Sequence, residues 1–462
     1  MRTAKNKREM LSMIYKTSEL KVEIVSPSME SLFGAMGARS GFEEVDGLFM
    51  DLGGGSVQMT YLNSKHLENY GILAAEAARS LPFGAARLSA ALNTQETADM
   101  AKKDLRRGMK ETFEAMKERF PHLKQQADHE DGVTIYFCGG GFRGYGSMLM
   151  HTDPIQPYPI PAIGGYAVPG HRFVQWQKML HESQKDGKVF GVSKRRKQQF
   201  PAIVEVVRAL VDAVPKIKRV IFCSGGNREG VLYMKLPPSF REANPLVLVP
   251  GGMVEPDQNA IESIIQTIFN AVPETPVEDT FPTHQLLLYV AKNMYLGMGN
   301  TDDANSARAL HNPISGDLAR VPGMTHRTQA IYALTMCARW GTDLGPVDRS
   351  LFQSLRGLIG PETSFLCEYI GTVARGLASL VPAFPIGKDD YLMLRSLISK
   401  TEWVTNLGKK GKKPGIRLSM TINPRNVYGY RSPEAITDIF TGAGKGFDLG
   451  WKVELNVQVL EE

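Results

Sequence analysis

The sequence predicts an α/β protein that continues into a helical domain and ends on a β segment. Apolar runs at residues 48–50, 133–137 and 219–223 each lead into a glycine cluster. Repeated strand-to-glycine-to-helix segments are typical of a sheet whose ligand cleft lies at the carboxyl ends of its strands. Residues 282–382 instead show a helical pattern rich in Leu, Ala and Met, and residues 451–459 alternate between apolar and polar side chains. The first pattern predicts an all-α domain, and the second predicts a half-buried strand.

The chain is organised around VDGLFMDLGGGSVQMTYL, residues 45–62. A strand runs into Asp51, the cluster Gly53, Gly54, Gly55 and Ser56 follows, and a second strand begins near Val57, which predicts a β-hairpin. We expect the glycines to turn at positive φ and to bring backbone N–H groups close to an anion. Asp51 at the mouth of the loop could hold Mg²⁺ through water. A glycine-rich hairpin tip can equally be only a turn, so both interpretations stay open.

The segment before the hairpin predicts two helices and a strand. A helix runs from about residue 5 to residue 15, a short strand follows at residues 21–25, and a second helix covers residues 29–38 with Ser28 as its N-cap. Glu30 lies in the first turn of the second helix, where a carboxylate complements the helix dipole.

After the hairpin, residues 80–88 lead into a long helix for which Asn93 and Glu96 form a plausible capping pair. We expect one face of this helix to be buried and the opposite, basic face to be solvated. A later helix at residues 259–271 also shows an apolar stripe, and residues 153–170 read as a surface connection rich in Pro and Gly. The expected buried positions are Leu105, Met109, Phe113, Met116 and Phe120 in the first helix, and Ile261, Ile264, Ile265, Ile268 and Phe269 in the second.

Composition favours a protein that binds an anionic small ligand. The chain has 462 residues, a net charge of +6 and a pI near 8.9. This charge suits a nucleotide or polyphosphate, but it is spread too thinly to indicate direct nucleic-acid binding. No apolar run approaches the length of a bilayer span, and no signal peptide is visible, so we expect a cytoplasmic protein that does not bind membranes.

Cysteine and histidine patterns give no strong metal signal. The cysteines at positions 138, 223, 337 and 367 are far apart, and we expect buried free thiols of a reducing compartment. His284, His311 and His326 could form a metal site in the helical domain, but core or surface histidines are the favoured interpretation.

Several stretches together resemble the exopolyphosphatase and guanosine-pentaphosphate phosphatase family. These are DLGGGS (51–56), SLPFGAARL (80–88), CGGGFRG (138–144), KRRKQQFPA (194–202) and CSGGNREGVLY (223–233). The closer likeness, in SVQMTYL (56–62) and ALHNPISGDLARVPGMTHR (309–327), is to the fungal branch called retrograde regulation protein 2. That branch relays mitochondrial dysfunction to nuclear genes.

The resemblance implies an actin-like, RNase-H-like (ASKHA) fold with two α/β lobes, followed by a helical domain related to HD phosphohydrolases. It also implies that Gly53, Gly54, Gly55 and Ser56 bind phosphate, that Asp51 holds Mg²⁺, and that Glu30 is the general base. The domains expected on this basis are a remnant of the first lobe (1–45), a second lobe (46–273), the HD-like domain (282–400) and a C-terminal α/β tail (401–462).

Three departures from the family pattern bear on activity. A first phosphate hairpin of the type DIGSN does not precede Met1, so the first lobe is expected to be truncated. Gln58 stands where the family has a carboxylate, and a glutamine can neither take a proton nor supply charge to a metal. His311 is followed by Asn312 where an HD phosphohydrolase has a metal-binding His-Asp pair.

Two functional hypotheses follow. The first is a regulator of the retrograde type that binds polyphosphate or a guanine or adenine nucleotide and acts through regulatory protein partners. The second is an active Mg²⁺-dependent phosphoanhydride hydrolase.

Overall fold

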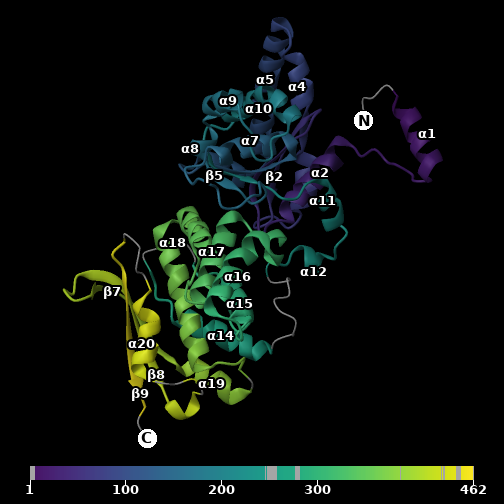
Figure 1. The fold of residues 1–462 in the computed structure, drawn as a ribbon. Coiled ribbons are helices and arrows are strands. Elements are labelled where there is room, and N and C mark those ends of the chain that lie inside the picture. Colours follow the sequence, from purple (N-terminus) through teal and green to yellow (C-terminus); the bar gives the residue numbers. More distant parts are fainter. Residues whose placement is uncertain are drawn as a thin grey trace. The chain divides into compact units, whose positions relative to one another are not determined.

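The chain folds into two compact units. We describe them from a computed structural model, which covers residues 6–244, 246, 257–275, 281–385, 387–427, 429, 432–443 and 449–460. The first unit comprises Met1–Thr152 and Ala162–Glu242, and the second comprises Asp153–Pro161 and Ala243–Glu462 (Figure 1).

The first unit is built on a six-stranded sheet with the order β3-β2-β1-β4-β6-β5. Strands β1, β2 and β3 form an antiparallel meander, β4 and β6 continue the sheet parallel to β1, and β5 pairs antiparallel with β6. The carboxyl ends of β1, β4 and β6 therefore meet at one edge, as the three strand-to-glycine segments predict. The strands are β1 (Asp46–Leu52), β2 (Val57–Asn63), β3 (Arg79–Leu81), β4 (Val133–Cys138), β5 (Ala167–Pro169) and β6 (Ile217–Phe222).

Helices cover both faces of this sheet. On one face α2 packs over a core that includes Phe49, Tyr136 and Ile221. On the other, Phe142 of α7 stacks on Phe137 of β4 with ring centroids 4.1 Å apart. The helices of the unit are α1 (Lys7–Ser18), α2 (Pro27–Arg39), α3 (Tyr70–Ala77), α4 (Ala85–Ala91), α5 (Gln95–Arg119), α6 (Pro121–Asp128), α7 (Gly139–His151), α8 (Gly170–Phe173), α9 (Trp176–Gln184), α10 (Lys194–Ala213), α11 (Asn227–Tyr233) and α12 (Pro238–Arg241).

The beginnings of α2 and α5 differ from the predicted ones. The N-cap of α2 is Ser26, whose hydroxyl accepts from the Met29 N–H, because Pro27 fits the first helical turn. The cap of α5 is Thr94, so the predicted pairing of Asn93 with Glu96 is wrong. The predicted strand at residues 21–25 is also wrong: this stretch has no regular secondary structure.

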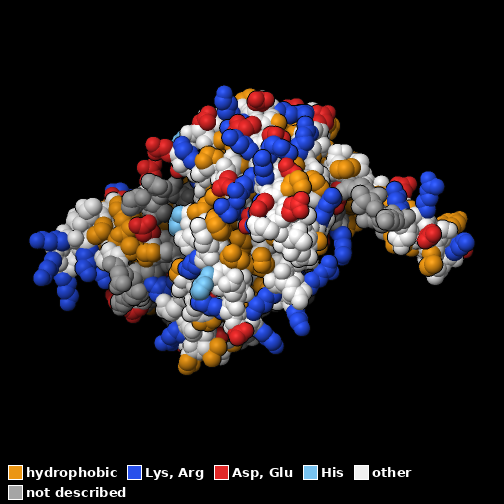
Figure 2. Space-filling view, turned by 90° about the horizontal axis from the view of Figure 1, so that it is seen from above, with side chains coloured by type: hydrophobic (Ala, Val, Ile, Leu, Met, Phe, Trp, Pro, Cys, Tyr) orange, Lys and Arg blue, Asp and Glu red, His pale blue; other side chains and the backbone are white. Residues whose placement is uncertain are grey.

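The long helix α5 carries the predicted buried face: its four expected apolar residues are buried, and so is Phe120 just beyond its last residue. Its basic face is balanced by acidic side chains of α10: Arg106 lies 4.0 Å from Glu205 and 3.6 Å from Asp212. Figure 2 likewise shows Lys and Arg side chains interspersed with Asp and Glu on the face in view. The helix therefore presents a mixed charged surface.

The second unit is a helical body with a small sheet. In the sheet β7 pairs antiparallel with β8, and β8 pairs parallel with β9. The predicted helical domain and the final strand are both confirmed. Its elements are α14 (Gln258–Asn270), α15 (His284–Asn293), α16 (Asp302–Ser315), η1 (Asp317–Arg320), α17 (His326–Arg339), α18 (Pro346–Leu380), α19 (Lys388–Ser396), β7 (Ile398–Leu407), β8 (Lys413–Ile422), η2 (Pro424–Asn426), α20 (Pro433–Thr441) and β9 (Lys452–Val459).

Two segments pack differently from their sequence interpretation. Helix α14 belongs to the core of the second unit, whereas the sequence groups it with the α/β lobe. Its four isoleucines are buried as expected, but Phe269 is 56% exposed, so its predicted burial is wrong. The connection at residues 153–161 is more than a surface loop: Ile160 is buried, and the Tyr158 hydroxyl lies 2.8 Å from His326 Nδ1.

The remaining sequence expectations concern membranes and thiols. Among the described helices, none has both the length and the apolar character needed to cross a bilayer. All four cysteines are buried free thiols, as predicted.

Candidate functional site

Asp51 and Gln58 face each other at the carboxyl edge of the sheet. They are direct partners across the β1–β2 hairpin, so their side chains project from the same face. Helix α2 packs on these strands, and Glu30 in its first turn lies close enough to act on Asp51 electrostatically. Burial and Glu30 together raise the pKa of Asp51 from 3.8 to about 6, although Arg143 opposes the shift. The structure thus brings together Glu30, Asp51 and Gln58, which lie apart in sequence.

Gln58 contributes a buried oxygen without a hydrogen-bond partner. Its side chain is 3% exposed, and its Oε1 accepts no hydrogen bond within the described part of the chain. An unsatisfied buried acceptor costs about 1–3 kcal/mol, so such a position favours a water or a ligand as partner. A hard cation such as Mg²⁺ fits this set, because carboxylate and amide oxygens are its preferred protein ligands. Asp51 and Gln58 Oε1 would hold the ion, with the Glu30 carboxylate nearby, and the ion would neutralise phosphate charge.

The glycine loop is anchored by the start of α4. Its carbonyl oxygens at Gly53 and Gly54 accept hydrogen bonds of 2.9–3.0 Å from the first N–H groups of α4. Gly84, which precedes α4, packs directly on the loop: a Cβ there would lie 2.3 Å from the Ser56 nitrogen. The start of SLPFGAARL therefore anchors the loop, and the loop carbonyls occupy the N-terminus of α4.

The loop glycines themselves are not required by the backbone. None of Gly53, Gly54 and Gly55 has a positive φ, so the expected positive-φ turn is wrong. A Cβ at Gly53 or Gly54 would meet only ordinary contacts, and one at Gly55 would meet nothing within 4 Å. Gly54 and Gly55 are exposed. Their lack of side chains leaves bare backbone at the surface, which suits close approach of a phosphate.

In the CGGGFRG segment after β4, one glycine has a positive φ and two lie against the side chain of Arg196. Gly139 has φ +83°, and a Cβ there would lie 2.2 Å from Asp51 Oδ1. Gly140 and Gly144, one helical turn apart on α7, make room for the side chain of Arg196. Gly139 thus lets the first turn of α7 approach the Asp51 carboxylate.

Two arginines approach each other beside α7. Arg143 donates to the Ser224 carbonyl at 2.7 Å, and Arg196 donates to the Gly191 carbonyl at 2.8 Å. Burial lowers the pKa of Arg196, and the charge of Arg143 lowers it further, so the two guanidinium groups repel. An anion between them would relieve this repulsion. Sequence analysis did not single out either residue, but the glycines four residues apart in CGGGFRG are a signal for a side chain lying across that helix.

The glycines of CSGGNREG allow two backbone segments to pack closely against each other. A Cβ on Gly225 would lie 2.0 Å from the Gly37 carbonyl oxygen, and one on Gly230 would lie 1.8 Å from the Phe33 carbonyl oxygen. Helices α2 and α11 therefore meet backbone to backbone. This contact fixes α2, and with it Glu30, over the carboxyl edge of the sheet.

The three histidines of the helical unit lie in separate environments. His311 Nε2 is 2.8 Å from Asp348, His326 contacts Tyr158, and His284 begins α15. Within the described ranges no group of three His, Cys, Asp or Glu side chains could hold a metal ion.

The α/β unit and this site define the class of protein. Residues 1–239 match the Ppx/GppA phosphatase family, and the chain belongs to that family. Residues 244–459 match the RTG2 C-terminal domain. Among curated proteins, the chain is similar to retrograde regulation protein 2 of Saccharomyces cerevisiae, with 28% identity over 397 residues. The match covers 82% of this chain and 66% of that relative, so the chain spans slightly less than two thirds of its length.

The chain is also similar in part to solved structures. The Aquifex aeolicus Ppx/GppA phosphatase, in its type II variant, is 20% identical, with a TM-score of 0.36 over 51% of this chain and 72% of that one. An exopolyphosphatase from Cytophaga hutchinsonii is 19% identical, with a TM-score of 0.36 over 50% of this chain and 71% of that one.

Proposed function

We propose that this protein is a retrograde-type regulator that binds a phosphate-rich ligand with Mg²⁺ and relays the bound state to protein partners. The ligand would be polyphosphate or a guanine or adenine nucleotide. The observation that carries the proposal is the Asp51–Gln58 pair: the α/β unit keeps an acidic, glycine-lined edge but has an amide beside its central carboxylate. The similarity to retrograde regulation protein 2 supports the regulatory role.

The chemistry of Gln58 favours binding over hydrolysis. Resemblance to the family leads one to expect a carboxylate at this position. An amide can donate one neutral oxygen to a cation, but it adds no negative charge and cannot accept a proton. The site would therefore hold Mg²⁺ and phosphate more weakly than a site with a carboxylate at position 58, and it would activate water poorly.

Hydrolysis remains the second candidate because Glu30 lies beside Asp51. The two carboxylates are close enough for Glu30 to raise the pKa of Asp51. A carboxylate at the first turn of α2 could take a proton from water, while Asp51 holds the metal. This arrangement would release terminal phosphate from a phosphoanhydride chain.

One experiment separates the two candidates. Phosphate release from long-chain polyphosphate and from guanosine pentaphosphate is measured with Mg²⁺, and binding of the same ligands is measured by calorimetry. Glu30→Gln tests the base, and Glu44→Gln is the matched control, since Glu44 is exposed and pairs with Lys65. Binding without release supports the regulator. Release that is lost in Glu30→Gln and kept in Glu44→Gln would establish the hydrolase instead.

The proposal also covers location and partners. We place the protein in the cytoplasm, where a signal from mitochondria could be passed on towards the nucleus. Recovery of a partner protein whose association changes with polyphosphate or nucleotide would support this role. Association that is indifferent to every phosphate ligand would contradict it.

A further inference from the structure

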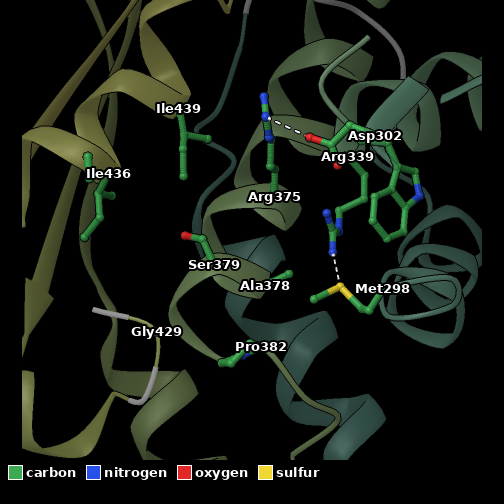
Figure 3. Close-up of a pocket in the computed structure, with 12 residues that line it drawn as sticks. Met298, Asp302, Arg339, Arg375, Ala378, Ser379, Pro382, Gly429, Ile436 and Ile439 are labelled. Carbon is green, nitrogen blue, oxygen red and sulfur yellow. Dashed lines mark hydrogen bonds and ion pairs between the residues drawn. The ribbon is translucent and has the colours of Figure 1, made fainter. Parts of the chain in front are cut away.

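The helical unit contains a cavity of about 600 Å³ that is separate from the phosphate edge of the sheet. Its wall includes residues of α16, α17, α18 and α20, and Ile436 and Ile439 lie across from Arg339, Arg375 and Asp302 (Figure 3). A concavity of this size that combines apolar side chains with a few converging polar groups is typical of small-molecule sites. The lining side chains used below are Asp302, Arg339, Trp340, Arg375 and Ile439.

Arg339 is a buried cation without a carboxylate partner. The residue is 4% exposed, and its guanidinium donates to the Met294 carbonyl at 2.9 Å and contacts the Met298 sulfur at 3.3 Å. The guanidinium carbon lies 4.1 Å from the centre of the Trp340 ring. No carboxylate of the described residues lies within ion-pair distance of it. Burial lowers the pKa of Arg339 to about 10, so its charge is costly but present at neutral pH.

A second guanidinium shares the cavity. Arg375 lies 3.4 Å from Asp302, and both of these side chains are partly exposed. Arg375 also acts on Arg339 as a like charge. Two guanidinium groups and one carboxylate leave the lining with a net positive charge. The Asp302 carboxylate pairs with Arg375 and acts on Arg339 only at longer range, so among the described residues the more deeply buried cation has no ion-pair partner of its own.

A buried polar group nearby has the same deficit. The Tyr295 hydroxyl has no hydrogen-bond partner in the described part of the chain. Tyr295 lies close enough to Arg339 for each to influence the other's charge. Buried charges and hydroxyls without partners are rare in folded proteins because each costs free energy, and of these two groups Arg339 is the one that lines the cavity.

From this geometry we propose that the cavity binds a small organic oxyanion, with its carboxylate or phosphate group at Arg339 and Arg375 and its body against Trp340 and Ile439. Guanidinium groups bind both oxyanions through paired N–H donors, so the two ligand chemistries share one site. The proposal does not depend on the function of the α/β unit.

The test uses the full chain with two probes, benzoate for a carboxylate with an apolar body and inorganic phosphate for a bare oxyanion. Binding is followed by titration of tryptophan fluorescence, because Trp340 lines the cavity, and by calorimetry. Saturable binding of benzoate, phosphate or both is expected, and the stronger probe identifies the oxyanion source. Absence of saturable binding of both probes up to about 10 mM would overturn the proposal, since that limit corresponds to less than about 3 kcal/mol.

Charge variants locate the probe. Asp302→Asn removes the competing carboxylate and should tighten binding about 2- to 5-fold, whereas Arg375→Gln should weaken it by a similar factor. Asp303→Asn is the matched control: it makes the same charge change on the same first turn of α16, but Asp303 does not line the cavity. Arg339→Lys keeps the charge while removing the paired donors, and should weaken binding about 10-fold or more. Equal effects of Asp302→Asn and Asp303→Asn would show that the probe binds elsewhere.

Discussion

Asp51 and Gln58 are direct partners across the first two strands. The Asp51 carboxyl group, whose pKa is raised, therefore lies beside the Gln58 amide oxygen, which has no hydrogen-bond partner among the described residues. Without a bound ligand, each side chain destabilises the fold for a different reason. Asp51 is a partly desolvated charge near a second carboxylate, and Gln58 has lost water without gaining a donor. A single bound cation would satisfy both.

The first prediction concerns Gln58→Glu. A third carboxylate at this edge should lower the free energy of unfolding by about 1–3 kcal/mol without metal, because like charges repel in a buried place. Mg²⁺ should restore the loss, since the variant offers the ion more charge than the natural chain does. Thermal melting in EDTA and in MgCl₂ measures both effects.

Gln58→Met is the control for this change, because it removes the unsatisfied acceptor without adding charge. It should stabilise the protein by about 1 kcal/mol and leave the melting temperature independent of Mg²⁺. A Gln58→Glu variant that melts alike with and without Mg²⁺ would contradict the assignment of this edge as a cation site.

The second prediction concerns pH. The pKa of Asp51 is about 6 in the folded chain, above its ordinary 3.8, so folding favours the protonated carboxyl. Its effect is most favourable below about pH 4 and is lost as pH rises through 6, by at most about 3 kcal/mol. Asp51→Asn should remove this dependence and stabilise the α/β unit above pH 6. Hydrogen exchange of the β1 amides, compared between wild type and variant at each pH in EDTA, measures the difference. If wild type and Asp51→Asn differ in β1 amide protection by the same amount at pH 4.5 and at pH 7.5, Asp51 does not titrate in this range.

The third prediction contrasts two glycines of the loop region. Gly84→Ala places a Cβ 2.3 Å from the Ser56 nitrogen, so the loop must shift, and we expect a loss of about 1–3 kcal/mol in stability. Gly55→Ala meets open space and should melt within about 1 °C of wild type, because it removes no contact of the chain. It should still weaken guanosine pentaphosphate binding about 10-fold, since the new methyl group lies where the phosphate would approach. Unchanged binding in Gly55→Ala would mean that the glycine tip is only a turn.

The fourth prediction tests how α2 is positioned. Gly37→Ala would place a Cβ 2.0 Å from the Gly226 carbonyl oxygen and should force α2 away from α11, at a cost of about 1–3 kcal/mol. Gly41→Ala, just beyond the same helix, meets only the Ala38 carbonyl oxygen at 3.5 Å and serves as control. Urea unfolding gives the stability, and the displacement of Glu30 should also return the pKa of Asp51 towards its ordinary value. Equal stability of the two variants would show that the glycine contact does not hold α2.

Local pattern was enough to predict β1, β2, β4, β6 and β9, but it missed β3, β5, β7 and β8 and wrongly placed a strand at residues 21–25. The hairpin around Asp51, the strands that precede the glycine clusters, the buried face of α5 and the final alternating strand depend on periodicity, which short stretches of chain carry by themselves. Helix starts were less predictable: Ser26, Ser28, Asn93 and Thr94 are all good caps, and packing and proline placement decided which was used.

The sequence by itself determined which residue types are present at the candidate site: an aspartate before three glycines, and a glutamine where a carboxylate is expected. Only the tertiary structure decided what those residues do to one another. Strand register set Gln58 beside Asp51, and the glycine contact between α2 and α11 brought Glu30 over both. Likewise, neither Arg339 nor Arg375 shows any motif in the sequence, and only helix packing places the two guanidinium groups in one cavity. The burial, electrostatic environment and pKa of these side chains depend on neighbours that are far away in the sequence. The periodicity of the sequence does not indicate which residues become neighbours.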